Sequence, residues 1–236
     1  MYRVDIGGQT LKRIVFPDSG QARELAEDLQ ATRGRAVFPE LVGQQGADVW
    51  VEFLDGTCVS AFDTRGIAEL ARLYAALYSI DSQLRPIDSG PWLPDIEADL
   101  AFLARAGVLA CGPHQELRSR LADWTPAQVW VGYDYSDPRP ANVLVGEDGS
   151  YRFIDIESLG RHRLLGSGVA KACYRWLGDR REELLAALRQ YPCAPVLETL
   201  PFVELASLAS WTRRSLLLRK PKLVRPALFE RLLERR

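Results

Sequence analysis

Hydrophobic and polar positions alternate at the start of the chain, in the segment YRVDIGGQTLKRIVF that covers residues 2–16. Short alternating runs on either side of a dipeptide that tolerates positive φ are typical of a β-hairpin. We therefore expect two strands that turn at Gly7–Gly8. A further strand is expected in residues 47–56, ADVWVEFLDG, which end in a turn.

The spacing of apolar residues changes to three and four after residue 18, which is the period of a helix. Asp18 or Ser19 is expected to cap the first helix, because Gln21 follows Asp18 at the distance of a capping box. The apolar stripe of this helix consists of Ala22, Leu25, Ala26 and Leu29. A second, well-buried helix is expected from Arg65, in RGIAELARLYAALYSID.

Helical spacing dominates the rest of the chain. Helices are expected at residues 95–106 and 114–122, and again after Ser158 in DRREELLAALRQY and PALFERLLERR. The whole pattern predicts an α+β chain with two lobes. A small β-rich lobe covers residues 1–56, a larger and mainly helical lobe covers residues 57–236, and the segment EFLDG connects them.

The composition is that of a soluble globular protein. Of the 236 residues, 47% are hydrophobic and 26% are charged, and the formal net charge is −1. This balance gives no support for a nucleic-acid partner. No apolar run reaches the roughly 18 residues needed to cross a bilayer, and the first residues lack the apolar stretch of a signal peptide. We therefore expect a cytoplasmic protein.

Several classes of site are disfavoured by the residue types that the chain lacks. The four cysteines lie far apart without a C-x-x-C pair, and there are only two histidines, His114 and His162. A zinc site is therefore not expected. The chain contains neither a G-x-S-x-G elbow nor a G-K-[ST] sequence, which argues against a serine hydrolase and against a P-loop enzyme.

Residues 135–158, YSDPRPANVLVGEDGSYRFIDIES, carry the candidate chemistry. The strands NVLV and YRFIDIE flank the turn GEDGS, so they are expected to form a hairpin with Asn142 and Asp155 at its open end. Both side chains could then reach one metal ion, and Asp137 precedes Asn142 by five residues. Transfer of a phosphoryl group from a nucleotide requires a carboxylate that holds the accepting hydroxyl, oxygen ligands for Mg²⁺ and a cation on the phosphates.

Each of these residues also has a structural interpretation. An aspartate before a proline commonly initiates a turn, and Asp134 is a second candidate for the catalytic carboxylate. A lysine in a short strand, such as Lys12, is usually solvated. Asp155 differs, because a carboxylate inside an apolar strand is costly to bury without a metal or cation beside it.

The three residues together resemble the catalytic and metal loops of protein-kinase-like folds. The similarity is greatest to the aminoglycoside phosphotransferase and choline kinase group, whose pattern is H-G-D-x-x-P-x-N-x-L followed by I-D. Aligned on Asn142, Pro140 matches the proline of that pattern, and Asp137 stands at the position of the catalytic base. Asn142 and Asp155 stand at the positions of the two Mg²⁺ ligands.

The resemblance extends more weakly to other parts of the chain. VWVEFLDG is similar to the strand and hinge that receive the adenine, and TLKRIVF supplies Lys12 at the position of the lysine that contacts the nucleotide phosphates. The acid that would orient Lys12 stays open among three residues of the following helix. These are Glu24, Glu27 and Asp28.

Two departures from the family pattern favour an alternative. The family's H-G-D is Tyr135-Ser136-Asp137 in this chain, and too few residues precede Lys12 for a full glycine-rich phosphate loop. A pseudokinase, which keeps the fold as a binding or scaffold module without transferring phosphate, is therefore the alternative from another class.

The segment WTRRSLLLRKPKLVRP near the end of the chain concentrates basic residues around a leucine run. These are Arg213, Arg214, Arg219, Lys220, Lys222 and Arg225. Such a segment is either a solvated helix face or a contact with an anionic substrate or membrane surface. The second interpretation favours a kinase of lipopolysaccharide-core sugars.

The resemblance as a whole implies an ATP- and Mg²⁺-dependent phosphotransferase. Its partners would be a nucleotide and a small-molecule or sugar acceptor that offers a hydroxyl. The helices that would select the acceptor show only generic amphipathic patterns, so the sequence leaves the acceptor undetermined.

Overall fold

The computed structural model describes residues 2–234 and begins with an antiparallel four-stranded sheet in the order β1-β2-β4-β3. The strands are β1 (Tyr2–Ile6), β2 (Gln9–Val15), β3 (Leu41–Gln45) and β4 (Asp48–Glu52). The predicted hairpin is confirmed, because Gly7 and Gly8 form the turn with φ values of 58° and 83°. The sequence analysis did not predict β3, which lies at one edge of this sheet.

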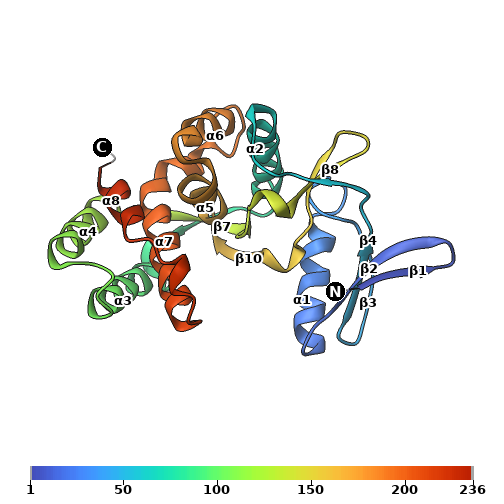
Figure 1. Cartoon of the computed structure of the whole chain (residues 1–236), viewed down its shortest axis with the longest axis horizontal. Coiled ribbons are helices and arrows are strands. Elements are labelled where there is room, and N and C mark those ends of the chain that lie inside the picture. The colour runs from blue at the N-terminus through green and yellow to red at the C-terminus, as the bar shows by residue number, and fades with distance from the viewer. Residues whose placement is uncertain (1, 235–236) are drawn as a thin grey trace.

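One helix, α1 (Ser19–Ala31), covers a face of this sheet, as Figure 1 shows. Asp18 caps it as expected, since its carboxylate accepts a hydrogen bond of 2.9 Å from the backbone N–H of Gln21. The predicted apolar stripe is buried. The β-rich part of the fold therefore follows from the alternation and the helical period in the sequence.

The rest of the chain contains two further small sheets. One has the order β5-β8-β9 and the other β10-β7-β6. Their strands are β5 (Gly56–Cys58), β6 (Gln83–Pro86), β7 (Gln128–Tyr135), β8 (Val143–Gly146), β9 (Tyr151–Phe153) and β10 (Leu159–Leu164).

The predicted hairpin of residues 143–153 is present as β8 and β9, which pair in antiparallel fashion. The prediction was wrong in one respect: β9 ends at Phe153, so Asp155 lies beyond the strand rather than inside it. The expectation that the chain is mainly helical after Ser158 holds apart from β10, which pairs with β7.

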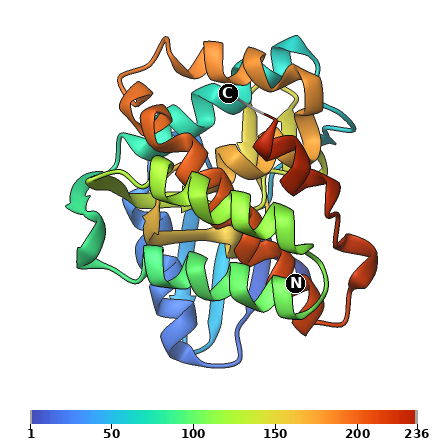
Figure 2. The ribbon, with the colours of Figure 1, turned by 90° about the vertical axis from the view of Figure 1, so that its left-hand side faces the viewer.

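Helices make up the larger, mainly helical lobe. They are α2 (Thr64–Tyr78), α3 (Trp92–Arg105), α4 (Cys111–Trp124), α5 (Ser167–Ala172), α6 (Arg181–Leu188), α7 (Leu200–Leu217) and α8 (Ala227–Leu233). Figure 2 shows α3, α4 and α7 as a layer at the end of the molecule opposite the four-stranded sheet. None of the helices in residues 2–234 is long and apolar enough to cross a membrane.

An aromatic cluster joins the four-stranded sheet to the two loops that contain Asp137 and Asp155. Tyr135 and Phe153 stack with ring centroids 4.0 Å apart, and Phe38 lies 5.6 Å from each of them. Tyr74 of α2 donates a hydrogen bond of 2.8 Å to the carbonyl oxygen of Tyr135. Tyr135 comes just before Asp137 in the chain and Phe153 just before Asp155, so the cluster fixes the starting points of both candidate loops.

Candidate functional site

The first loop of the site follows β7 and contains Asp137 and Asn142. Pro138 and Pro140 restrict its backbone, and the N–H of Asn142 donates to the carbonyl oxygen of Arg139 at 2.8 Å. The carbonyl oxygen of Asn142 accepts a hydrogen bond of 2.9 Å from the N–H of Ile154. The second loop, which contains Asp155, is therefore held directly against the first.

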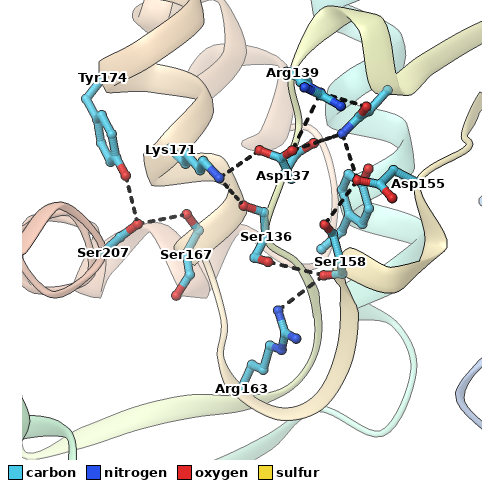
Figure 3. A network of polar contacts seen from close by, with 12 residues as sticks. Ser136, Asp137, Arg139, Asp155, Ser158, Arg163, Ser167, Lys171, Tyr174 and Ser207 are labelled. Carbon is cyan, nitrogen blue, oxygen red and sulfur yellow. Dashed lines mark hydrogen bonds and ion pairs between the residues drawn. The ribbon is translucent and has the colours of Figure 1, made fainter. Parts of the chain in front are cut away.

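The three predicted side chains converge on one point (Figure 3). The amide nitrogen of Asn142 donates to Asp137 Oδ2 at 3.0 Å and to Asp155 Oδ2 at 3.2 Å. Asn142 is buried, and both carboxylates are half-buried. Two carboxylates beside one amide form an anionic, oxygen-rich group at the open end of the β8–β9 hairpin, where the sequence predicted it.

Lys12 reaches this group from the first sheet. Its ammonium donates a hydrogen bond of 2.5 Å to the carbonyl oxygen of Ile154, the residue before Asp155. Burial lowers the pKa of Lys12, and the charges of Asp155 and Glu157 partly oppose that effect. None of the three acids left open as its partner takes that place, since Glu27 and Asp28 pair with Arg161 and no hydrogen bond from Lys12 to Glu24 occurs in residues 2–234.

Two basic residues that the sequence analysis did not select contact the same group. Lys171 of α5 donates to Asp137 Oδ1 at 2.7 Å and to the carbonyl oxygen of Ser136 at 2.9 Å. Arg139 donates through Nε to Asn142 Oδ1 at 2.8 Å and lies 3.6 Å from Asp137 Oδ2. Arg139 stands inside the quoted loop and was accessible to sequence reasoning, whereas Lys171 is brought in only by the packing of α5.

Asp134, the second candidate for the catalytic carboxylate, has a different environment. It is fully buried and accepts hydrogen bonds from the hydroxyl of Tyr78 at 3.0 Å, the N–H of Tyr135 at 2.9 Å and the N–H of Gly168 at 3.0 Å. Burial raises its pKa to about 6, although these hydrogen bonds oppose the rise. A carboxyl group with no exposed surface, whose oxygens accept hydrogen bonds from three internal donors, offers nothing to a substrate.

The residues present fit a magnesium ion that is shared with a nucleotide. Mg²⁺ prefers oxygen ligands and commonly takes one or two from carboxylates and the others from phosphate and water. Asp155 supplies such oxygens, and a rotation of the Asn142 carboxamide by half a turn would point Oδ1 toward Asp155. No group of three or more His, Cys, Asp or Glu side chains that could hold a metal by itself occurs in the described part of the chain, so phosphate oxygens would have to complete the ligand set.

A cavity of about 690 Å³ opens on the helical side of the loop that contains Asp137, which is the candidate catalytic loop. Its lining includes Ser136, which precedes Asp137 in the chain, and Lys171, which donates to Asp137 Oδ1 at 2.7 Å. Its walls come from α3, β10, α5 and α7, and Trp92, Tyr174 and Trp211 supply aromatic surface. Its size lies in the range of roughly 300–1,000 Å³ that is typical of small-molecule sites.

Comparison with known proteins gives no match by sequence. No model of a known protein family matches the chain, and no curated protein matches it.

Solved structures do match. A macrolide 2'-phosphotransferase from Brachybacterium faecium aligns with a TM-score of 0.64 and 13% identity over 98% of this chain and 85% of its own. The choline kinase LicA from Streptococcus pneumoniae aligns with a TM-score of 0.61 and 12% identity over 99% of this chain and 86% of its own. A thermostable mutant of the aminoglycoside phosphotransferase APH(4)-Ia was solved with AMP-PNP and hygromycin B. It aligns with a TM-score of 0.63 and 15% identity over 98% of this chain and 88% of its own.

These identities are too low to transfer an activity, but the alignments cover nearly the whole chain. The resemblance inferred from Asp137, Asn142 and Asp155 is thereby confirmed at the level of the fold. The chain has the two-lobed, protein-kinase-like fold of the aminoglycoside phosphotransferases, macrolide phosphotransferases and choline kinases.

Proposed function

We propose that the protein is a phosphotransferase that uses ATP and Mg²⁺ to phosphorylate a hydroxyl group of a small molecule or sugar. The observation that carries this proposal is the single amide nitrogen of Asn142 that bonds the carboxylates of both Asp137 and Asp155. Like charges repel, so two carboxylates beside one amide need positive charge nearby, and a bound Mg²⁺ ion would add to the charge that Lys171 and Arg139 supply. Structures of the same fold contain AMP-PNP or carry the name of a kinase, which supports the assignment.

Each residue has a defined task in this proposal. Asp137 accepts the hydrogen bond of the acceptor hydroxyl and takes its proton as the acceptor oxygen bonds to the γ-phosphorus and the bond from that phosphorus to the β–γ bridging oxygen breaks. Asn142 and Asp155 hold the Mg²⁺ ion, which neutralises phosphate charge when it is bound. Lys12 contributes a further positive charge at the nucleotide phosphates.

Substitution of Asp155 tests the proposal. We expect Asp155→Asn to abolish the rise in melting temperature that Mg–ATP causes in the wild type, because a ligand that binds only the native state stabilises it by mass action. Asp137→Asn should retain that rise and lose ADP release. Glu147→Gln, an exposed change in the turn of the same hairpin, is the matched control and should change neither measurement.

The pseudokinase alternative rests on the position of the β1–β2 turn. Figure 1 shows this hairpin projecting at the far end of the molecule from β7 and α5, so Gly7–Gly8 does not cover the catalytic loop in this arrangement. A wild-type protein that binds Mg–ATP and releases no ADP with any acceptor would support the pseudokinase. The absence of any thermal shift at millimolar Mg–ATP would contradict the kinase and favour a scaffold module that binds no nucleotide.

A membrane-held sugar is a second candidate acceptor. Leu217 and Leu218 at the end of α7 are 62% and 54% exposed, and Arg219, Lys220 and Lys222 follow them. Leu217 also lines the cavity beside the catalytic loop. Exposed leucines among basic residues are the composition that binds anionic membrane surfaces.

Vesicle sedimentation tests this candidate. The protein should pellet with phosphatidylglycerol vesicles and remain in solution with phosphatidylcholine vesicles, and the double variant Leu217→Asn/Leu218→Asn should bind the anionic vesicles less. A protein that stays in solution with both kinds of vesicle would leave only a dissolved acceptor.

A further inference from the structure

The cavity beside the catalytic loop carries an excess of positive charge. Four basic side chains and two acidic ones line it, and its single histidine is counted as neutral. They are Arg163, Lys171, Arg213, Arg214, Asp95 and Asp99. The excess arises in a chain whose overall net charge is −1, so it is a local feature rather than a consequence of composition.

Existing ion pairs do not use up this charge. Arg213 pairs with the buried Asp99 at 2.7 Å, and Lys171 pairs with Asp137 at 2.7 Å. Arg214 makes no side-chain hydrogen bond and no ion pair within the described chain. The cations of the cavity therefore fall into two groups: Arg213 and Lys171 are neutralised by ion pairs, and Arg163 and Arg214 remain available.

Arg163 belongs to the available group. It is half-buried, and within residues 2–234 its guanidinium donates only to the carbonyl oxygens of Ser158 at 3.1 Å and Leu159 at 3.5 Å. Asp134 and Asp28 act on it electrostatically, and neither forms an ion pair with it in the described residues. A guanidinium has five N–H donors in a planar fork, so Arg163 retains donors of the geometry that carboxylates and phosphates accept.

A bulge in β10 sets the position of the Arg163 side chain. The register of β10 against β7 shifts between Gly160 and Arg163, and His162 in between has a φ of 56°. The guanidinium of Arg163 then lies over Gly160, in the space that a side chain at residue 160 would occupy. Figure 3 shows Arg163 reaching Ser158 beside Ser136.

The uncharged part of the lining suits a hydroxylated ring. Trp92, Tyr174 and Trp211 offer flat apolar surface, and the lining also contains the hydroxyl-bearing Ser136, Ser167, Ser207 and Ser210. Serine hydroxyls both donate and accept hydrogen bonds, as the hydroxyls of a sugar do. Arg175 lies 4.4 Å from the ring centroid of Trp211 and adds another positive charge behind this wall.

We propose that this cavity takes an anionic acceptor, a sugar or cyclic polyol that carries a carboxylate or phosphate, and that Arg163 and Arg214 bind its charged group. The inference rests on the phosphotransferase proposed above, whose Asp137 accepts a hydrogen bond from Lys171 and follows Ser136, two residues of the cavity lining. A hydroxyl of the acceptor beside these two residues would gain the γ-phosphoryl group of ATP and lose its proton to Asp137. Cationic acceptors such as choline or hygromycin B, named with structures of this fold, would be repelled.

Two sets of monosaccharides, each with neutral, cationic and anionic forms of one sugar, test which charge the acceptor carries. Glucose, glucosamine, glucuronate and glucose 6-phosphate form one set, and galactose, galactosamine, galacturonate and galactose 6-phosphate form another. Binding is measured by calorimetry without nucleotide, and ADP release is measured with Mg–ATP. We expect an anionic member to bind most tightly in at least one set, with an affinity that falls as salt is added.

Charge-removing variants identify the residues. Arg163→Gln and Arg214→Gln should each weaken binding of the preferred sugar roughly tenfold or more and raise KM accordingly, because a charge-assisted hydrogen bond is lost. The kcat should stay within about twofold, since neither residue contacts Asp137. Arg189→Gln, at an exposed arginine after α6 and outside the cavity, should leave binding and KM unchanged.

The outcomes separate this inference from the proposed function. Tightest binding by a neutral or cationic sugar, binding of no anionic member at millimolar concentration, or unchanged KM in both arginine variants would overturn the anionic acceptor. A thermal shift with Mg–ATP in the same preparation would show that the nucleotide site remains valid. Binding of an anionic sugar without any response to Mg–ATP would retain the cavity assignment and contradict the kinase. Vesicle sedimentation then distinguishes a dissolved anion from one presented on a membrane.

Discussion

At the scale of single residues, the site depends on how charge is distributed around Asp137. Asn142 bonds one of its carboxylate oxygens and Lys171 the other. The ammonium of Lys171 offsets the negative charge that Asp137 and Asp155 bring to one place. It contacts Asp137 and the backbone of Ser136, and it makes no hydrogen bond to Asn142 or Asp155 in the described residues. In the proposed reaction, Lys171 would therefore position Asp137 on the acceptor side and would not act on the metal side.

Replacing Lys171 should separate catalysis from nucleotide binding. We expect Lys171→Met to lower kcat roughly tenfold or more, because Asp137 loses a charge-assisted hydrogen bond that fixes its orientation. The thermal shift caused by Mg–ATP should remain. Lys171→Arg, which keeps the charge, should recover part of kcat. Loss of the thermal shift together with kcat would assign Lys171 a merely structural role.

Asp134 gives a prediction about pH and stability. Its pKa is raised to about 6 in the folded protein from an ordinary value of 3.8. A carboxylate with a raised folded pKa stabilises the fold fully below its unfolded pKa, and this contribution is lost as pH rises between about 4 and 6. The loss should amount to about 3 kcal/mol, and it should be complete above pH 6.

Urea unfolding measured across this pH range checks the effect. In Asp134→Asn the part of the pH dependence between about 4 and 6 should disappear. The amide would turn an N–H toward the N–H of Gly168 or Tyr135, so the variant should also be less stable at pH 7 by about 1–3 kcal/mol. An unchanged pH dependence in the variant would assign the titration to another group.

At the scale of elements, close approach of α5 to β7 sets the geometry of the loop. A Cβ atom at Gly168 would collide with the carbonyl oxygen of Tyr135 and with the hydroxyl of Tyr74, which bond one another. The glycine therefore lets α5 approach the end of β7 closely enough for Lys171 to reach Asp137. Neither obstacle is the free end of an exposed side chain, so the collision cannot be relieved cheaply.

Gly168→Ala should consequently destabilise the protein by about 1–3 kcal/mol or more. It should also lower kcat, because α5 would move Lys171 away from Asp137. Gly112→Ala is the matched control, since that glycine lies in α4 with nothing near its missing side chain. The control should keep or slightly raise stability. Equal melting temperatures for both variants would contradict the packing argument.

Elements with clear periodicity could be predicted from the sequence, and those defined by pairing could not. The β1–β2 hairpin and α2 follow from alternation and helical spacing, and the loop of Asp137 follows from a motif. The strand β6, QLRP, is exposed throughout and contains a proline, so it has no apolar face to detect. The strand β10, LGRHRL, is interrupted by a bulge and rich in basic residues. Arg163 lies in the undetected β10, and Lys171 reaches Asp137 only through the packing of α5 against β7, which is why sequence reasoning missed both.

At the scale of the whole molecule, the four-stranded sheet is tied to the rest by a few specific contacts. The N–H of Phe153 donates to the carbonyl oxygen of Val37 at 2.8 Å, and Arg152 pairs with Glu52 at 3.0 Å. Phe38, only 3% exposed, packs on Tyr135 and Phe153. The division into lobes at residues 1–56 and 57–236 stays a prediction, and these contacts decide how independently such lobes would unfold.

We expect the wild type to unfold cooperatively and Phe38→Ala to break that cooperativity. The substitution should cost about 3–5 kcal/mol, because it leaves a cavity between the sheet and the two candidate loops. Phe229→Ala in α8 removes an equally buried ring at a distance from this junction and is the matched control. Hydrogen exchange across a urea series can follow peptides from β4 and β7 separately. In Phe38→Ala the β4 peptide should exchange at lower urea than the β7 peptide, whereas in the control both should exchange together. Coincident exchange in both variants would mean that the sheet and the helical part unfold as one unit without the help of Phe38.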